Sequence, residues 1–217
     1  MSQHAKHIAD IRQDYLLAAL DDETVGDDPL LFFRNWFAEA EAAEITEINA
    51  MTLATADGQG RPHARIVLLK GLDDLGFVFF TNYDSAKGQD VAVNPQVALL
   101  FFWKELERQV RIEGVIEKID PAESDAYFHS RPVGSRIGAW SSPQSQPIAH
   151  RNVLDVNFER YQKEFSDIEI PRPPHWGGYR VVASRIEFWQ GRSSRMHDRL
   201  MFEKNAAGSW QRSRLAP

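Results

Sequence analysis

Cysteine is absent from this sequence of 217 residues. Without it the chain can form no disulfide, no thiolate nucleophile and no cysteine-based zinc site. Long apolar runs are also missing. The longest, VALLFFW at residues 97–103, is far shorter than the ~20 residues that a membrane-spanning helix needs. Residues 1–15 contain no apolar core of the signal-peptide kind, so we expect a cytoplasmic protein without membrane contacts.

Motifs for several common chemistries are missing as well. There is no HExxH sequence and no group of carboxylates and histidines at the spacing of metal ligands, so we expect no metal site. Without GxGxxG, Walker and GxSxG motifs, a Rossmann site, a P-loop and a hydrolase nucleophile all lack support. The net charge of −6 is too acidic for a general nucleic-acid binder. Any basic cluster must therefore be local, which favours a small anionic ligand.

Apolar residues make up 43% of the chain, enough for a substantial core. Periodicity and capping signals predict helices at 7–20, from 29 (with Asp28 as N-cap), after Ser85, at 121–130 and at 148–166. They predict strands at 51–55, 63–70, 77–81, 97–103, 109–119 and 179–190, with a short last strand after a turn at 205–209. The first three strands should form an antiparallel meander, and residues 131–147, rich in Pro, Gly and Ser, a long functional loop.

Helices and strands do not alternate along this pattern, which argues against a doubly wound parallel sheet. We predict an α+β protein, mainly antiparallel β, built as a closed or split β-barrel with surrounding helices. We divide the chain into an N-terminal helical segment, residues 1–28, and a single domain, residues 29–217.

The stretch FWQGRSSRMHDR, residues 188–199, concentrates positive charge. If residues 195–202 form a strand, Arg195, His197 and Arg199 share one face, and Asp198 points to the other. Such a face either binds an anion, most simply a phosphate held by guanidinium groups, or is a solvated basic edge. Positive neighbours favour a neutral imidazole at His197, which could accept a proton, although an ordinary hydrogen-bonding histidine also fits.

Two further clusters fit a phosphate. Arg65 and Lys70 bracket the apolar run of RIVLLK, where charges at strand ends could reach a ligand or simply be solvated. Tyr127 and Arg131 share a helix face, with Ser130 and Ser135 close in sequence. Arg131 could equally cap the end of its helix.

Seven longer motifs, taken together, resemble the pyridoxamine 5′-phosphate oxidase family, in a similarity that runs from about Arg12 to Pro217. These motifs are RIVLLK (65–70), FFTNYDSAKGQD (79–90), LERQVRIEG (106–114), YFHSRPVGSRIGAWSSPQS (127–145), WGGYRV (176–181), IEFWQGRSSRMHDR (186–199) and RLAP (214–217). The resemblance implies a split β-barrel that binds FMN at the interface of a homodimer. It also implies oxidation of pyridoxamine or pyridoxine 5′-phosphate by O2 to pyridoxal 5′-phosphate, with release of H2O2.

The resemblance also assigns residues, position by position. The implied FMN contacts are Arg65, Ile66, Val67, Leu68, Leu69, Lys70, Phe80, Thr81, Lys87, Gln109, Gln144, Ser145, Trp189 and Arg199. The implied substrate contacts are Arg12, Gln13, Asp14 and Tyr15 in a segment that closes over the site, then Lys70, Tyr127, Arg131, Ser135, Arg195, Met196 and His197. Arg195 and His197 are the implied catalytic pair. One position departs from the pattern, because Ala86 stands where the family usually has arginine, which predicts weaker flavin binding.

Three other functions compete with this interpretation. Another split-barrel flavoenzyme is disfavoured because all the implied substrate contacts are present together. A non-catalytic flavin- or pyridoxal-phosphate-binding carrier is disfavoured by the intact Arg195 and His197. An RNA-binding barrel is disfavoured by the acidic charge.

Overall fold

The computed structural model describes residues 14–217 of the chain. They form two compact units, which we name by their place in the sequence. The central unit contains residues 49–100 and 112–184, from the middle of the chain, and the outer unit contains residues 14–48, 101–111 and 185–217. Three strands, β5 (Gln96–Trp103), β6 (Arg108–Lys118) and β7 (Trp176–Gln190), have residues in both units.

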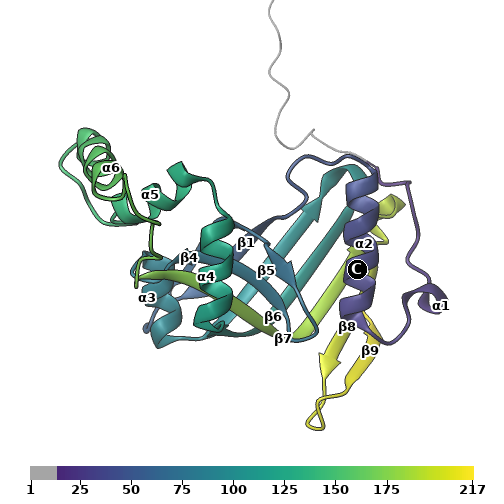
Figure 1. The fold of residues 1–217 in the computed structure, drawn as a ribbon. Helices are drawn as coiled ribbons and strands as arrows, with labels where there is room; N and C mark the ends of the chain where they lie inside the picture. Colours follow the sequence, from purple (N-terminus) through teal and green to yellow (C-terminus); the bar gives the residue numbers. More distant parts are fainter. Residues whose placement is uncertain (1–13) are drawn as a thin grey trace, which may run out of the picture. The chain divides into compact units, whose positions relative to one another are not determined.

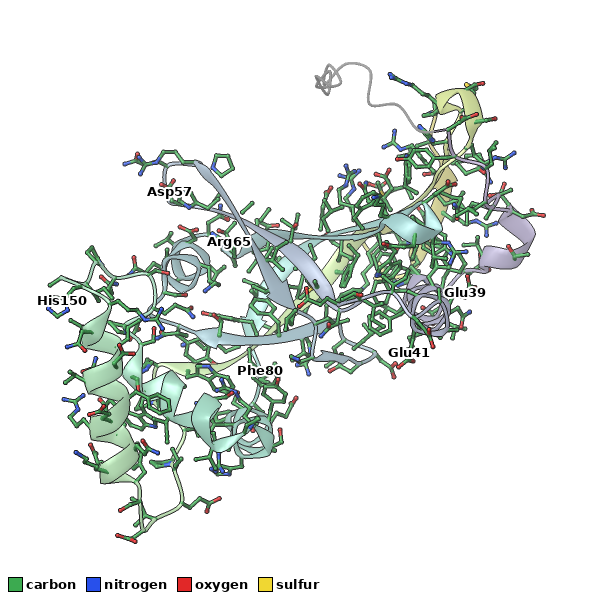
Figure 2. The ribbon with its side chains drawn as sticks, turned by 90° about the horizontal axis from the view of Figure 1, so that it is seen from above. Glu39, Glu41, Asp57, Arg65, Phe80 and His150 are labelled. Atoms are coloured by element: carbon green, nitrogen blue, oxygen red, sulfur yellow. The ribbon has the colours of Figure 1, made fainter. Side chains whose placement is uncertain are left out.

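The sheet of the central unit has the strand order β2-β1-β5-β6-β7-β4-β3. Its other strands are β1 (Ala50–Ala56), β2 (Pro62–Leu68), β3 (Gly71–Leu72) and β4 (Phe77–Asn82). Strand β1 pairs antiparallel with β2 and β5, and β4 pairs antiparallel with β3 and β7. Figure 2 shows the β1–β2 hairpin with Asp57 at its tip and Arg65 farther along β2.

Alternating burial along the strands builds the core of this sheet. On β1 the buried side chains are Met51, Leu53 and Thr55, and on β6 they include Ile112. Gly114 continues the buried face of β6, where a Cβ atom would lie 2.1 Å from the carbonyl oxygen of Val182. Only glycine permits this close approach of two backbones.

Four helices belong to the central unit: α3 (Ala86–Val93), α4 (Pro121–Ser130), α5 (Val133–Ser141) and α6 (Asn152–Glu164). The Ser85 hydroxyl caps α3, and the Asp120 carboxylate caps α4. Helices α5 and α6 lie side by side (Figure 1). Ile137 of α5 belongs to an apolar cluster with Phe128, Phe165, Ile170 and Trp176. Phe158 and Tyr161 of α6 pack against this cluster.

The outer unit is organised around α2 (Pro29–Ala42). Its N-cap, Asp28, accepts hydrogen bonds from the amides of residues 30 and 31, and proline occupies the first turn. Phe33 is fully buried against Phe101, with ring centroids 5.0 Å apart, and Trp36 packs edge-on against Phe188. The remaining elements of this unit are the short helix α1 (Asp22–Val25), the 3-10 turns η2 (Lys104–Leu106) and η3 (Ser193–Arg195), and the hairpin of β8 (Asp198–Lys204) and β9 (Trp210–Arg214).

Most predicted elements are confirmed within four residues at their ends. The pairings of β1 with β2 and β5, of β4 with β3 and β7, and of β8 with β7 and β9 are all antiparallel. Among residues 14–217, no helix has the length and apolar character required to cross a membrane. The same residues contain no group of three or more metal-ligating side chains.

Four predictions about local structure were wrong. Residues 14–20 are not helical and have no regular secondary structure, while 7–13 lie outside the described residues. The meander fails because β4 pairs with β3 and β7 rather than β2. The predicted loop 131–147 contains helix α5, since Pro132 immediately precedes its first turn and Ile137 supplies a buried anchor.

The fourth error concerns the strand expected at 195–202. Strand β8 begins at Asp198, after a turn in which Ser194 and Arg195 have φ values of 55° and 61°. Side chains in such a turn do not alternate between two faces as they do in a strand. Arg195, His197 and Arg199 therefore do not form one row of a sheet face.

Candidate functional site

A cavity of about 340 Å³ in the central unit collects many of the residues singled out in the sequence. Strand β2 and the segment after it, β4, α3, α4 and the segment after α5 all contribute to its wall. The lining residues are Ile66, Val67, Leu68, Lys70, Phe80, Thr81, Lys87, Tyr127, Arg131, Gln144 and Trp176. Three cations line it, with no carboxylate among the lining residues, so the cavity suits an anionic ligand.

Lys87 is the polar centre of this cavity. Its ammonium group donates to the hydroxyls of Thr81 and Ser85, both at 3.1 Å, and to the side-chain oxygen of Gln144 at 2.7 Å. Burial, with a smaller contribution from the nearby Arg65 charge, lowers the pKa of Lys87 to about 8. An anion placed here would relieve both effects.

Three stacked aromatic rings form a wall of the same cavity. Phe80 stacks on Tyr127 with centroids 3.8 Å apart, and Trp176 is nearly parallel to both rings. The guanidinium of Arg131 lies over the Trp176 ring at 4.6 Å. The wall can therefore contact a flat ring while the cation contacts an anionic substituent.

Arg131 has an unsatisfied buried donor. Its Nη1 atom is buried without a hydrogen-bond partner, and burial lowers the pKa of its guanidinium. The Arg131 side chain does not cap α4. The cap is instead the backbone N–H of Arg131, which donates to the Phe128 carbonyl. A cavity of about 250 Å³ joins Arg131 with Ser135 and Gln144. An orphaned guanidinium N–H is a site for a ligand oxygen.

Arg65 lies beside this cavity rather than in its lining. Its Nη1 donates to the Leu53 carbonyl at 3.1 Å and to the Thr55 hydroxyl at 2.7 Å. Its Nη2 is 3.6 Å from the carboxylate of Asp90, which is buried on α3. Burial lowers the pKa of Arg65, although the Asp90 charge opposes the shift.

The outer unit gathers a second set of predicted residues. The rings of Trp189 and His197 have centroids 4.6 Å apart, and Tyr15 packs edge-on against both. The backbone N–H of Arg192 donates to Nδ1 of His197 at 3.1 Å. This bond requires an unprotonated Nδ1, so the neutral ring carries its proton on Nε2 and presents a donor there.

Three more predicted residues lie on or against the loop between β7 and β8. Arg195 has a positive φ, and Met196 is largely exposed. The Asp14 carboxylate accepts a hydrogen bond from the Ser194 backbone N–H. Gly191 begins the loop, and a Cβ atom there would lie 2.7 Å from the Tyr15 ring.

Arg199 is paired with a carboxylate that the sequence did not point to. Its Nε donates to Glu187 at 2.7 Å, and its Nη1 donates to the Ala216 carbonyl. Glu187 is almost fully buried and also lies 2.7 Å from Arg111. The other carboxylate considered, Asp198, instead binds Arg192 and Arg214.

The remaining predicted residues are placed as follows. Leu69 is buried just after β2, Gln109 is half-buried on β6, and Ser145 is an exposed residue with a φ of 68° next to Gln144. Arg12 and Gln13 lie outside the described residues. The structure thus brings most of the predicted ligand contacts into two clusters, one in each unit.

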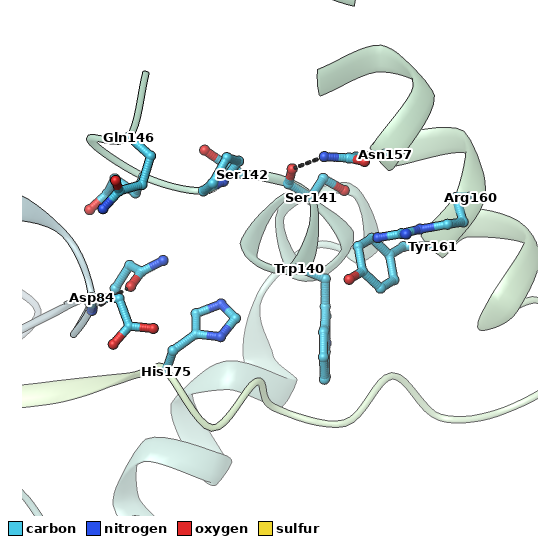
Figure 3. A pocket seen from close by; sticks show the side chains of 12 residues that line it. Asp84, Trp140, Ser141, Ser142, Gln146, Asn157, Arg160, Tyr161 and His175 are labelled. Carbon is cyan, nitrogen blue, oxygen red and sulfur yellow. Dashed lines mark hydrogen bonds between the residues drawn. The ribbon is translucent and has the colours of Figure 1, made fainter. Parts of the chain in front are cut away.

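Several residues of these clusters were missed in the sequence. Trp176 closes the aromatic wall, Asp90 faces Arg65, and Glu187 pairs with Arg199. A further cavity of about 420 Å³ was also missed because helix α5 was taken for a loop. Figure 3 shows its wall, in which Asn157 donates to the Ser141 carbonyl and both Asp84 and Arg160 are present. Only the WGGYRV motif could have drawn attention to Trp176.

Comparison with known proteins gives sequence matches over nearly the whole chain. Residues 37–164 match the family described as "Pyridoxamine 5'-phosphate oxidase". Residues 176–217 match the family described as "Pyridoxine 5'-phosphate oxidase C-terminal dimerisation region". The chain is 59% identical to a pyridoxine/pyridoxamine 5′-phosphate oxidase of Ralstonia pickettii, over 97% of this chain and 99% of that protein. It is 56% identical to the protein of the same name from Synechocystis, over 97% and 98% of the two chains.

Solved structures give the same fold. PhzG from Burkholderia lata, in complex with tetrahydrophenazine-1-carboxylic acid, is 28% identical with a TM-score of 0.87, covering 93% of this chain and 99% of its own. A pyridoxamine 5′-phosphate oxidase-related, FMN-binding protein from Nostoc punctiforme is 17% identical with a TM-score of 0.67, covering 85% and 97%. The predicted fold class, a mainly antiparallel split barrel with surrounding helices, is confirmed by these similarities.

Proposed function

The chain belongs to the pyridoxine/pyridoxamine 5′-phosphate oxidase family, and from this premise we propose the reaction that it catalyses and the residues that serve it. It is an oxidase of pyridoxine and pyridoxamine 5′-phosphate, and FMN is its cofactor. The substrate is oxidised at its C4′ carbon to pyridoxal 5′-phosphate. O2 takes up the electrons as H2O2, and water releases ammonia from the amine substrate.

The observation that carries this proposal is the cavity of the central unit. It joins Lys70, Lys87 and Arg131 to a stacked aromatic wall, and it includes a buried guanidinium donor without a partner. Phosphate esters on flat rings match both features, because a guanidinium group binds phosphate oxygens while aromatic rings contact the ring faces. Both the cofactor and the substrate belong to this chemical class.

The residues present fit FMN. Lys87 and Arg65 would hold its phosphate, near the capped N-terminus of α3. The backbone and side chains of residues 66–70, with Thr81 and Gln144, would contact the rest of it. When bound, FMN supplies a ring that accepts a hydride equivalent from the substrate and passes two electrons to O2.

The substrate phosphate is assigned to Lys70, Tyr127, Arg131 and Ser135. Three of these residues line the cavity, and Ser135 lines the adjoining one with Arg131. Burial weakens the hydration of the Arg131 charge, so its pairing with a phosphate dianion gains more than it would in water.

Arg195 and His197 are assigned to the substrate ring. Because Nδ1 of His197 accepts from the Arg192 N–H, the neutral imidazole orients a substrate hydroxyl or amine by donating from Nε2. Accepting the substrate proton on Nδ1 would require this bond to break. Tyr15 packs against the rings of Trp189 and His197, and Asp14 accepts a hydrogen bond from the Ser194 N–H of the same loop. These contacts support a role for both residues in covering bound substrate.

A homodimer is proposed as the working form. The match of residues 176–217 to a dimerisation region supports it. Trp189, Arg199, Arg195 and His197 all belong to this matched region, so a second copy is the natural route by which they would reach a site at a subunit interface. A cytoplasmic location and the division at residue 28 remain predictions.

The test is direct. Purified protein reconstituted with FMN should be yellow, and pyridoxamine 5′-phosphate added without oxygen should bleach the flavin colour. Air should restore the colour as pyridoxal 5′-phosphate and H2O2 accumulate in equal amounts. A yellow protein that this substrate does not bleach would overturn the assigned reaction, and a protein that cannot take up FMN would overturn the cofactor. Turnover near wild type after joint replacement of Arg195 and His197 would refute their assignment.

A further inference from the structure

Asp90 is an anion inside a cluster that otherwise suits anion binding. Its Oδ2 atom accepts a hydrogen bond from the Thr55 hydroxyl at 2.6 Å and lies 2.9 Å from Nδ1 of His63. The same oxygen lies 3.6 Å from the guanidinium of Arg65. The four residues come from β1, β2 and α3 of the central unit.

A carboxylate at this place has an opposing effect on phosphate binding. It fixes the Arg65 guanidinium, which would otherwise be held only by the Leu53 carbonyl and the Thr55 hydroxyl. It also cancels part of the Arg65 charge that a phosphate would experience. How strongly it cancels that charge depends on what else the carboxylate binds.

His63 is the group that can change this balance. Its side chain is 45% exposed, so it exchanges protons freely with water, whereas the Asp90 side chain is only 7% exposed. A neutral imidazole donates one ordinary hydrogen bond from Nδ1, while an imidazolium adds a full positive charge beside the carboxylate.

We infer that Asp90 is a positioning residue for Arg65, and that protonation of His63 neutralises Asp90 and thereby strengthens the hold of Arg65 on a phosphate ester. The inference rests on the proposed FMN function, since it concerns the phosphate of that cofactor. The cluster gives the site a proton-dependent charge without any change in the residues that touch the ligand.

The sign follows from the neighbouring charges. Around His63 these are Asp90 and, through it, Arg65, with Lys87 on the same helix as Asp90; β1 contributes the uncharged Thr55 hydroxyl. A proton on His63 raises the net positive charge of this group by one, so phosphate affinity should rise as the pH falls and His63 gains its proton. Lys87, with a pKa of about 8, is mostly charged up to pH 7.5, and the small part that loses its proton does so in all three proteins compared below.

The experiment compares FMN and riboflavin binding to the protein stripped of flavin, followed by quenching of flavin fluorescence at pH 5.5, 6.5 and 7.5. The proteins are the wild type, Asp90→Asn and His63→Gln. Asparagine keeps an acceptor for Thr55 and glutamine keeps a donor for Asp90, so the shape of the cluster survives in both. The phosphate of FMN itself titrates near pH 6, and this contribution cancels when the variants are compared.

We expect the wild-type affinity for FMN to fall roughly three- to tenfold from pH 5.5 to 7.5 relative to His63→Gln, as for one added charge a few ångströms from a phosphate near a protein surface. His63→Gln should keep the weaker affinity of the wild type at pH 7.5 throughout, and Asp90→Asn, which has lost the carboxylate charge, should bind FMN more tightly than the wild type at pH 7.5. Riboflavin, which lacks the phosphate, should bind with no such difference among the proteins.

The possible failures are distinct. If the wild type binds FMN and both variants follow the same pH profile, the inference is wrong and the proposed function stands. If the wild type does not distinguish FMN from riboflavin at any pH, the proposed cofactor site is wrong and the inference falls with it. Thermal melting of each variant shows whether the fold is intact. Should Asp90→Asn not fold, His63→Gln alone decides, because an unchanged pH profile in that variant overturns the inference.

Discussion

The ammonium group of Lys87 donates a hydrogen bond to the side-chain oxygen of Gln144 at 2.7 Å, across 57 positions of sequence. The contact links the first turn of α3 to the segment after α5, the stretch that the sequence indicated was only a loop. It also defines the polar end of the cavity, where a half-buried cation is held by neutral oxygens. Neutral partners leave its charge available to a ligand.

The burial of Lys87 predicts a dependence of stability on pH in the flavin-free protein. Its folded pKa, about 8, lies below the unfolded value, so between pH 8 and about 10.4 the unfolded chain binds more protons and stability rises with pH. We expect the free energy of unfolding by urea to increase from pH 7.5 to 9.5 by on the order of 1 kcal/mol more in the wild type than in Lys87→Met. Equal pH slopes in the two proteins would contradict this. FMN affinity should change in the opposite direction, falling above pH 8 as the ammonium loses its charge.

Ala86 predicts room for a stronger cofactor site. The residue is exposed at the first position of α3, directly beside Lys87. Arginine there would add a charge-assisted hydrogen bond to the FMN phosphate, worth about 1.5–3 kcal/mol, so Ala86→Arg should tighten FMN binding about tenfold or more. Fluorescence titration measures it, with Ala86→Gln as the uncharged control. An unchanged affinity would show that the phosphate is not bound at this end of α3.

Arg131 should act mainly through substrate affinity. Its unpaired buried Nη1 predicts that a ligand phosphate completes its hydrogen bonds. Arg131→Met keeps the contact with Trp176 but removes the donors, so KM for pyridoxine 5′-phosphate should rise about tenfold to a hundredfold. Ser135→Ala, which removes one neutral donor, serves as the milder comparison. Steady-state kinetics would contradict the assignment if kcat fell while KM stayed constant.

Replacing His197 with asparagine should preserve the stability of the protein but lower its catalytic efficiency. Asparagine can accept the Arg192 N–H bond that Nδ1 accepts now, but it places no donor at the position of Nε2. We therefore expect His197→Asn to keep the melting temperature and lose kcat/KM by about tenfold to a thousandfold, and His197→Ala to lose both. If His197→Asn were as active as the wild type, the imidazole would serve only to hold the loop.

Glu187 should be a principal determinant of stability in the outer unit. It is 3% exposed and paired with both Arg111 and Arg199. Breaking a fully buried ion pair costs about 3–5 kcal/mol, but the side chains of Arg199 and Arg111 are 26% and 38% exposed, so water can partly replace Glu187 and we expect a loss of about 1–3 kcal/mol. Urea unfolding of Glu187→Ala should show this loss, and Glu187→Gln, which keeps the shape and the acceptor, should lose less. A change below about 1 kcal/mol in the alanine variant would mean that water fully replaces Glu187 as the partner of both arginines.

Local signals in the sequence predicted the elements that local chemistry controls. Asp28 before Pro29 and Ser85 before α3 cap their helices as expected, because a cap involves residues only two or three positions apart. The strand pattern likewise located β6 within one residue at each end. Motif resemblance located most residues of the cavity wall.

The errors arise where structure depends on distant partners. Glycines and serines lower the helix propensity of α5, but burial of Ile137 in the apolar cluster around Trp176 stabilises it. The turn at Ser194 carries no glycine, so nothing local indicated that β8 starts only at Asp198. No local signal in the sequence links Asp90 to Arg65, Glu187 to Arg199 or Trp176 to Phe80. These pairs come together only in the folded chain.

The hydrogen atom that serves as the side chain of Gly191 has a role larger than its size. Because the Tyr15 ring occupies the space where any other residue would place its first carbon, even a methyl group here would push an aromatic side chain out of its seat. Such a replacement would leave the sheet and the cavity of the central unit untouched. A protein altered in this way should fold and yet fail to place Tyr15 beside His197.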